Sequence, residues 1–436
     1  MKIAFYLENR NIPHVDLSQP EFGNPGCGGT EYLFVALPYY LSKRDKISYQ
    51  PVIFANNISK LPDCIPHFQV TDVQDAARCA KEENCAFFVY RPRRQPDPDF
   101  LELIDRLKLP SISWFHITPV ARHLQLLAQS KYLKATICVE HEQCDLAQDT
   151  AIWSKLSCIV NGFDLQGFQL KDPPEKEPGL VVYIGALVPQ KGFHLLARVW
   201  PRVLTRHPEA RLAVIGSGAL YNSKAKLGPW GVAESEYETQ HIIPYLAAED
   251  GQPHPSVEFL GRLGAEKKEY LYKAMVGVPN PGGQSENCPG SSIEIQACGT
   301  AVVTGAYFGL LDTVRNSETG LLGRSEDDLV NNICFLLENR GKAETFGTNG
   351  VKFVQERYNF SKVTSEWCEL FDRLALGKSP RRIPFKKNLN RHHKYLIFLN
   401  KYFQMVFGGF VNWPSIIDMK LYLFKWSFVK KNRGLK

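Results

Sequence analysis

Short apolar runs alternate with stretches of helical periodicity along this sequence, and that alternation limits the folds open to the chain. In the first half, the runs expected to form strands are Lys2 to Leu7, Pro51 to Ala55, Cys85 to Tyr90, Ser111 to Phe115 and Ala135 to Val139. Helical stretches such as Thr30 to Arg44 and Phe100 to Lys108 lie between them. Strands that alternate with helices are typical of βαβ units, which build a parallel sheet covered on both faces. We therefore expect a doubly wound domain here.

The alternation begins again after residues 170–179, a segment with two adjacent prolines and five charges that is typical of a linker. Residues 218–256 are long for a connection and are expected to hold helical or lid elements. The second set of strands is Leu180 to Gly185, Leu212 to Gly216, Val257 to Leu260 and Ala301 to Thr304. The helices expected with them include Phe193 to Thr205, Ala265 to Ala274, Ser291 to Cys298 and Leu329 to Glu338. This series predicts a second Rossmann-like domain.

The chain is long enough for two cores, because one hydrophobic core stops growing at about 250–300 residues and this chain has 436. We predict an α/β protein in which two Rossmann-like, doubly wound domains face each other across a cleft. The expected bounds are 1–168 and 169–357 for the two domains, 358–376 for a closing helix and 377–436 for a basic, aromatic tail. Ligands of such sheets bind outside the carboxyl ends of the strands, so the loops there form the candidate site.

Positive charge is concentrated at the C-terminus. Residues 377–436 contain ten Lys, four Arg and one Asp, a net charge of +13, which leaves −6 of the formal +7 for the first 376 residues. A basic appendage on a mildly acidic body indicates a localised anionic partner and argues against a nucleic-acid-binding core. The stretch Tyr395 to Val411 is mostly apolar and aromatic, and Trp413 and Trp426 follow it. This pattern favours a segment that lies on an anionic membrane surface, the alternative being an extra helix packed on the body with solvated charges.

Cysteine usage and the start of the chain favour a cytoplasmic protein. Eleven cysteines without a CxxC pair are typical of neither a disulfide framework nor a zinc module. The first residues lack the apolar region and cleavage site of a signal peptide. No uninterrupted apolar run approaches the length of about 18 residues that a transmembrane helix needs.

One loop after the first strand of each predicted domain has a composition suited to binding phosphate or, in the first loop, a polar acceptor. Residues 23–31 contain Gly28 and Gly29 and lead into a helix, so the backbone can approach a ligand near a helix start that attracts anions. Residues 185–192 place Lys191 where a cation can neutralise a diphosphate. The alternative interpretations are an ordinary strand-to-helix turn and a solvated lysine at a helix start.

Two carboxylates and one histidine complete the candidate set. Glu286 is expected in a loop and Glu294 about a turn and a half inside the helix that starts near Pro289, so the pair can hold one extended ligand with free helix amides between them. The alternative is an ordinary helix-start carboxylate and a surface residue. The apolar continuation at 295–299 favours function, because a Glu on a buried element needs a partner. His116, at a strand end, can bond a ligand hydroxyl or shuttle a proton, or it is a satisfied polar residue.

Together these loops resemble the retaining GT-B glycosyltransferases of family 4, the glycosyltransferase group 1 type, over about residues 1–376. The family's Glu-x7-Glu motif corresponds to Glu286 to Glu294, and 297–303 and 318–322 extend it. Asn161 to Asp164 looks like the family's interdomain segment, and Val257 to Gly261 like the strand near the nucleobase. The resemblance implies an acceptor-side first domain and a nucleotide-sugar-binding second domain. It also implies transfer of a sugar to a hydroxyl of a glycan or glycolipid in polysaccharide or lipopolysaccharide synthesis, without metal or cofactor.

The resemblance further implies a role for each candidate. Glu286 would hold hydroxyls of the transferred sugar and Glu294 would bond the nucleotide ribose, while Lys191 would offset the leaving-group charge. His116 would contact the sugar. Other donor-side positions are Gly28, Gly29, Asn287, Cys288, Gly290 and Ser291. In the family the departing phosphate deprotonates the acceptor on the same face, so the configuration is retained.

Two departures from the family pattern keep other functions open. The family often has Arg at the position of Ala186, so one phosphate cation is missing unless a residue such as Arg262 replaces it, and Pro289 removes an amide. One alternative is therefore a catalytically silent subunit that binds glycan or nucleotide. Another is an NAD-dependent oxidoreductase. The segment Val214 to Gly218 argues against it, because the third glycine and the acidic ribose partner of a dinucleotide site are missing.

Overall fold

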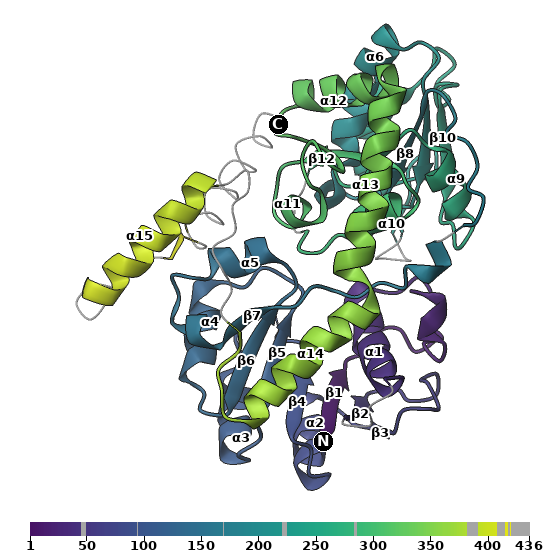
Figure 1. The fold of residues 1–436 in the computed structure, drawn as a ribbon. Helices are drawn as coiled ribbons and strands as arrows, with labels where there is room; N and C mark the ends of the chain where they lie inside the picture. Colours follow the sequence, from purple (N-terminus) through teal and green to yellow (C-terminus); the bar gives the residue numbers. More distant parts are fainter. Residues whose placement is uncertain are drawn as a thin grey trace. The chain divides into compact units, whose positions relative to one another are not determined.

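The computed structural model describes residues 1–44, 49–93, 95–168, 170–219, 225–282, 286–381, 391–407, 415, 416 and 419. The chain divides into two compact units, labelled by element in Figure 1. Unit 1 consists of Met1–Gly162 together with Phe360–Lys436, and unit 2 of Phe163–Asn359. After completing unit 2, the chain therefore returns to unit 1.

Unit 1 contains a seven-stranded parallel sheet in the order β3-β2-β1-β4-β5-β6-β7. The five strands predicted for this half are present with ends within two residues of the predicted ones, whereas β3 and β7 were missed because each has only three residues. The strand order reverses between β1 and β4, which is where doubly wound sheets bind ligands. The strands are β1 Lys2–Leu7, β2 Gln50–Ala55, β3 His67–Gln69, β4 Phe87–Tyr90, β5 Ser111–Phe115, β6 Leu133–Cys138 and β7 Leu156–Cys158.

Helices cover both faces of this sheet. The described helices are α1 Gly29–Ser42, α2 Val73–Glu82, α3 Pro98–Arg106, α4 Ala121–Gln129, α5 His141–Leu146, α14 Phe360–Ala375 and α15 Arg391–Phe407. Helices α2 to α5 contribute to one core with Phe115 and the residues that share its face of the sheet. On the other face α14 lies beside α1 (Figure 1), where Phe360 stacks on Tyr40 at 4.0 Å between ring centroids and Trp367 meets Trp114 at 5.1 Å. Because successive strand residues point to opposite faces, Trp114 and Phe115 belong to different cores.

Unit 2 contains a six-stranded parallel sheet in the order β10-β9-β8-β11-β12-β13. In chain order this is 3-2-1-4-5-6, so the reversal lies between β8 and β11. The four predicted strands are confirmed, but β11 and β13 were missed because glycines interrupt their apolar pattern. The strands are β8 Leu180–Ile184, β9 Arg211–Ile215, β10 Val257–Gly261, β11 Val276–Val278, β12 Ala301–Gly305 and β13 Gly320–Gly323.

The helices of unit 2 form a layer on each side of this sheet. They are α6 Phe193–Arg206, α7 Ser235–His241, α8 Ile243–Leu246, α9 Lys267–Lys273, α10 Gly290–Ala297, α11 Leu310–Thr313, α12 Glu326–Glu338 and α13 Arg340–Tyr358. One core joins α6 and α12 to the sheet through residues such as Trp200 and Ile333. The other joins α9 and α10 to the opposite face through Leu271 and Ile295. Unit 2 therefore buries apolar residues on both faces of its own sheet.

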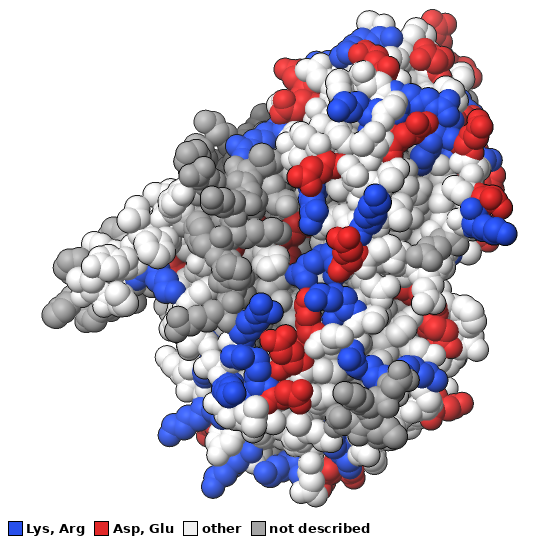
Figure 2. All heavy atoms as spheres, in the orientation of Figure 1, with Lys and Arg blue, Asp and Glu red and all other residues white. Residues whose placement is uncertain are grey.

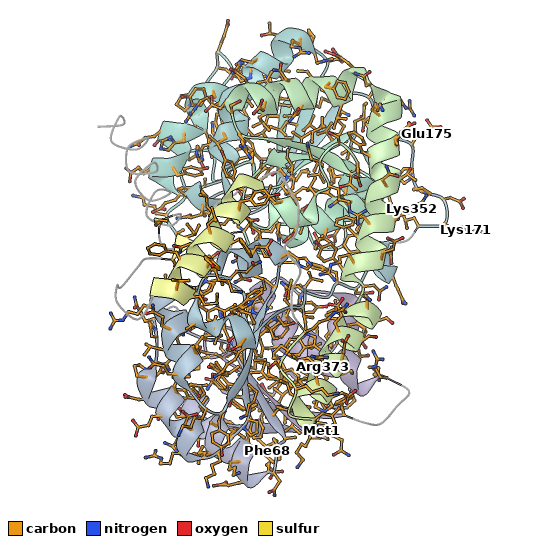
Figure 3. The ribbon with its side chains drawn as sticks, turned by 60° about the vertical axis from the view of Figure 1, so that its left-hand side comes forward. Met1, Phe68, Lys171, Glu175, Lys352 and Arg373 are labelled. Atoms are coloured by element: carbon orange, nitrogen blue, oxygen red, sulfur yellow. The ribbon has the colours of Figure 1, made fainter. Side chains whose placement is uncertain are left out.

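Two long connections are attached to unit 2. In the segment predicted as a linker, the Glu177 amide donates to the Lys273 carbonyl at 2.7 Å. Figure 3 shows Lys171 and Glu175 of this segment at the surface, on the side of α13 that carries Lys352. Residues 218–256 contain α7 and α8, so the helical elements expected there are present. The buried Glu238 carboxylate accepts backbone N–H bonds of 2.6–2.8 Å from residues 230, 232 and 233 and thereby shapes the preceding loop.

None of the helices within the described ranges is both long enough and apolar enough to cross a bilayer.

Candidate functional site

The reversal of strand order in unit 2 brings together two loops that are far apart in the sequence. Lys191 ends a short turn, Pro189–Lys191, that follows β8, and Glu286 lies in the loop after β11. The Lys191 ammonium donates to Oε1 of Glu286 in an ion pair. Nδ2 of Asn280 donates to the same carboxylate oxygen at 2.9 Å. Only 10% of the Glu286 side chain is exposed. This carboxylate is therefore largely buried, and a cation and an amide both donate to it.

Backbone geometry holds these groups in place. Gly192 has φ of +67°, and a Cβ on it would lie 2.5 Å from the amide nitrogen of Gly282, so this close approach requires glycine. Asn280 also has a positive φ, of +31°, and its carbonyl accepts the hydroxyl proton of Thr304 at 3.1 Å. The Gly309 amide donates to the Glu286 carbonyl at 2.8 Å. The Lys191–Glu286 pair is therefore fixed through its main chain as well as its side chains.

The second carboxylate has its own cation. Helix α10 begins at Gly290, directly after Pro289, and Glu294 is its fifth residue. Its carboxylate accepts from Nζ of Lys267, on α9, at 2.8 Å, and both side chains are about four-fifths buried. As expected from the sequence, Glu286 precedes the helix and Glu294 lies inside it. The two carboxylates of the motif are each neutralised by a different lysine.

The start of α10 offers hydrogen-bond donors beside these pairs. The first four N–H groups of an α-helix have no partner within the helix and carry a partial positive charge, which suits an anion. Gly290 and Ser291 supply the first two of these groups, and both residues are partly exposed. Asn287 is buried and Cys288 is half-buried in the turn that precedes the helix. Residues 283–285, part of the same predicted loop, lie outside the described residues.

Unit 1 has a corresponding arrangement at its own strand-order reversal. Gly28 precedes α1 and Gly29 is its first residue. Glu31, one turn further along, pairs with Arg91, which follows β4, at 2.9 Å. A Cβ on Gly28 would lie 2.0 Å from a carboxylate oxygen of Glu31. A side chain at position 28 would therefore displace the flexible Glu31 carboxylate from this ion pair, so glycine leaves room for the pair.

His116 follows β5 and carries a strongly shifted pKa. Its ring lies 4.5 Å from Trp114 and 6.0 Å from Phe34, measured between centroids. Burial, with a smaller contribution from the positive charge of Arg91, lowers its pKa from 6.5 to about 3. Near neutral pH the imidazole is therefore uncharged. It can exchange hydrogen bonds with a hydroxyl, but it does not carry an ionisable proton in that range.

Three participants were missed by sequence reasoning: Asn280, Lys267 and Arg91. Asn280 and Arg91 follow strands β11 and β4, and Lys267 is the first residue of α9. Only the tertiary structure shows which residue each of them meets. Ala186, where the family often has Arg, is buried. Arg262, the residue considered as a replacement cation, is exposed and follows β10, and β9 lies between β10 and β8 in the sheet. Among the described residues, no group of three or more His, Cys, Asp or Glu side chains has the arrangement of a metal site.

Comparison with known proteins assigns this part of the chain. Residues 168–353 match the family model described as glycosyl transferases group 1. These residues form a glycosyl transferases group 1 domain. The Lys191–Glu286 and Lys267–Glu294 pairs both lie inside this glycosyl transferases group 1 domain.

Individual relatives are similar at a lower level. An uncharacterized glycosyltransferase of Methanocaldococcus jannaschii is 23% identical over 57% of this chain and 59% of its own length. A D-inositol 3-phosphate glycosyltransferase of Kribbella flavida is 28% identical over 46% of this chain and 47% of its own length. The chain thus spans only about half the length of such relatives.

Structural comparison extends the similarity to the whole fold. A sucrose-phosphate synthase from Thermosynechococcus elongatus superposes with a TM-score of 0.61 at 17% identity, covering 87% of this chain and 100% of that one. The two parallel α/β sheets and this neighbour identify the architecture as GT-B, as predicted.

Proposed function

We propose that this protein is a retaining, family 4 glycosyltransferase that moves a sugar from a nucleotide-sugar to a hydroxyl of a glycan or glycolipid. The observation that carries the proposal is the Lys191–Glu286 ion pair at the strand-order reversal of a glycosyl transferases group 1 domain. A largely buried ion pair is weak evidence for a stabilising role, because desolvation offsets much of the attraction. At a ligand-binding edge, such a pair is better explained by the chemistry of a bound ligand.

In this proposal unit 2 binds the donor. The Glu286 carboxylate, held by Lys191 and Asn280, accepts hydroxyl protons of the transferred sugar. The Glu294 carboxylate accepts those of the nucleotide ribose. The partly positive start of α10, around Gly290 and Ser291, meets the diphosphate.

The proposed reaction needs stabilisation of negative charge more than a protein base. The bond between the anomeric carbon and the phosphate oxygen breaks, and its electron pair goes to the diphosphate. Lys191 offsets that developing charge, which is worth most in a site with little water. The acceptor oxygen bonds to the anomeric carbon from the same face, and its proton passes to the departing phosphate. Neither a metal nor a cofactor is part of this scheme.

Unit 1 supplies the acceptor side in this proposal. Its contributions are the loop at Gly28 and Gly29 and the neutral imidazole of His116. The imidazole forms a hydrogen bond with a sugar hydroxyl and stays uncharged. The acceptor belongs to cell-surface polysaccharide or lipopolysaccharide synthesis, and the enzyme works in the cytoplasm at the inner face of the membrane.

Substitutions at the ion pair test the proposal. Glu286→Gln keeps the shape but removes the charge that Lys191 and Asn280 hold, and we expect donor turnover to fall about a hundredfold or more. The matched control is Glu269→Gln, whose carboxylate pairs with Lys273 at 2.6 Å on the exposed side of α9. Release of nucleoside diphosphate from the donor is the readout. Full activity of the Glu286→Gln variant would remove Glu286 from the centre.

The donor class is found by a thermal-shift screen with UDP-, GDP-, ADP- and CMP-sugars, and with NAD as a comparison. A ligand that binds only the folded state raises its melting temperature, and the stabilisation grows with the logarithm of the ligand concentration relative to its Kd. Stabilisation by one sugar nucleotide, followed by turnover that survives EDTA, supports the enzyme. Stabilisation without turnover on any acceptor would instead indicate a silent binding subunit, and stabilisation by NAD alone an oxidoreductase.

A further inference from the structure

Helix α15 exposes more large apolar side chains than any other element among the described residues, and it belongs to unit 1. Six of its large apolar side chains are between 48% and 74% exposed, namely Leu396, Phe398, Leu399, Tyr402, Met405 and Val406. Figure 2 shows the described surface of this helix as mostly uncharged in that view. A soluble protein seldom leaves a contiguous apolar surface of this kind uncovered unless it binds something.

A polar anchor sets the orientation of α15. Nδ2 of Asn400 donates to the buried carboxylate of Asp149 at 2.6 Å, and the Ile416 amide donates to the same oxygen at 2.7 Å. Ile397, 1% exposed, packs on Leu146 of α5. These contacts come from one stripe of the helix, so the stripe that faces unit 1 is the one with the polar anchor. The opposite stripe is directed outward by the fold itself.

The lysine next to this anchor strengthens the arrangement. The Lys401 ammonium lies 4.3 Å from the ring centroid of Trp153 in a cation–π contact. Amphipathic helices normally turn their charged side to water and their apolar side to the protein. Here the polar residues Asn400 and Lys401 face the protein beside Ile397, whereas most of the other aliphatic and aromatic side chains of the helix are exposed.

Charge indicates what covers the outward face. The sequence of α15 contains no Asp or Glu, and it opens with Arg391, His392, His393 and Lys394. The whole segment 377–436 carries +13. A second copy of this chain would bring two such segments together against their mutual repulsion, whereas an anionic lipid surface attracts them. Tyr and Phe on the same face suit the headgroup region of a bilayer.

We propose that the outward face of α15 is a docking surface for an anionic phospholipid bilayer, held on unit 1 through Asp149 and Asn400. The helix lies along the interface with its apolar side chains among the acyl chains, and the net positive charge of segment 377–436 attracts the anionic headgroups. Residues 395–406 provide about 17 Å of such contact at 1.5 Å per residue. The proposal does not depend on the reaction catalysed, so it can fail while the proposed sugar transfer stands.

Vesicle flotation of the full chain is the test. We expect binding to vesicles of phosphatidylcholine with phosphatidylglycerol, weaker binding to pure phosphatidylcholine, and screening by salt. The triple variant Leu396→Gln, Leu399→Gln, Met405→Gln should bind anionic vesicles roughly tenfold less or weaker still, because each substitution removes apolar burial. The matched control, Phe22→Gln, Leu170→Gln, Phe335→Gln, changes three exposed apolar residues elsewhere and should bind unchanged.

A second variant separates the anchor from the surface. Asp149→Ala removes the acceptor of two hydrogen bonds and should speed hydrogen exchange in 391–407, while exposed Asp99→Ala should not. Equal flotation of the apolar triple variant and the unchanged protein would overturn the proposal. A second result would also overturn it. If light scattering showed a dimer, and the triple variant became a monomer with no change in vesicle binding, a second copy of the chain would occupy this face. Matching thermal unfolding of all variants confirms that they are folded.

Discussion

At the scale of the residue, His116 shows how burial decides a chemical role. Its pKa of about 3 means that the folded protein keeps the imidazole neutral where an unfolded chain would bind a proton. Between about pH 6.5 and 3 the unfolded state therefore takes up more protons than the folded state, so stability is lost as pH falls through that window. Above the ordinary pKa of 6.5, the imidazole is neutral in both states, so none of this stability has yet been lost.

We expect the free energy of unfolding to fall more steeply below pH 6.5 in the natural protein than in a His116→Gln variant. Urea unfolding at several pH values measures the difference. His123, whose pKa burial lowers to about 4, contributes equally to both proteins and so cancels. An imidazole of His116 that titrates near its ordinary pKa by NMR would contradict this account.

At the scale of the element, the start of α6 shows how one glycine positions a site. Gly192 precedes the helix with a left-handed backbone and touches Gly282 in the loop that leads to Glu286. We expect Gly192→Ala to lower stability by more than the cost of about 1–2 kcal/mol for placing a side-chain residue in that conformation, because backbone must also shift. The control Gly251→Ala has φ of +79° but no atom within 4 Å of its Cβ. Equal losses in urea unfolding would show that the close approach is not tight.

At the scale of the whole molecule, unit 1 is built from two separate parts of the chain. A Cβ on Gly162, the last residue of the first part, would lie 2.3 Å from the ring of Phe360, the first residue of the second. Helix α14, on which Figure 3 labels Arg373, buries Trp367 and Phe371 within this unit. The helix therefore completes a core that residues 1–162 cannot close.

We expect the fragment 163–359 to unfold cooperatively by itself, because both faces of its sheet are covered by its own helices. The fragment 1–162 should be poorly folded and bind apolar dyes, since it leaves Trp114 and Tyr40 uncovered. Adding residues 360–375, either by a fused linker or as a peptide, should restore cooperative unfolding by circular dichroism. A fragment 1–162 that is as stable alone as with α14 would rule out this role for the helix.

The local sequence pattern determined most of the strands and helices and the position of the Glu motif relative to its helix. Alternating apolar runs report a period that belongs to each segment alone, so β1 and β5 have the bounds expected from sequence, and α14 lies within the expected closing helix of residues 358–376. Very short strands and glycine-interrupted strands, such as β3 and β11, carry too few apolar residues to be distinguished. The concentration of positive charge after residue 376 was likewise a property of the sequence alone.

The tertiary structure decided which of these residues meet. Lys191 and Glu286 are 95 positions apart, and they pair because the first and fourth strands of unit 2 are neighbours in the sheet. Nothing near either residue encodes that strand order, and so neither Asn280 nor Lys267 stood out. The same holds for Asp149 and Asn400, 251 positions apart, whose hydrogen bond turns α15 with its apolar face outward. Segment patterns arise from local periodicity, whereas pairing depends on how the whole chain packs.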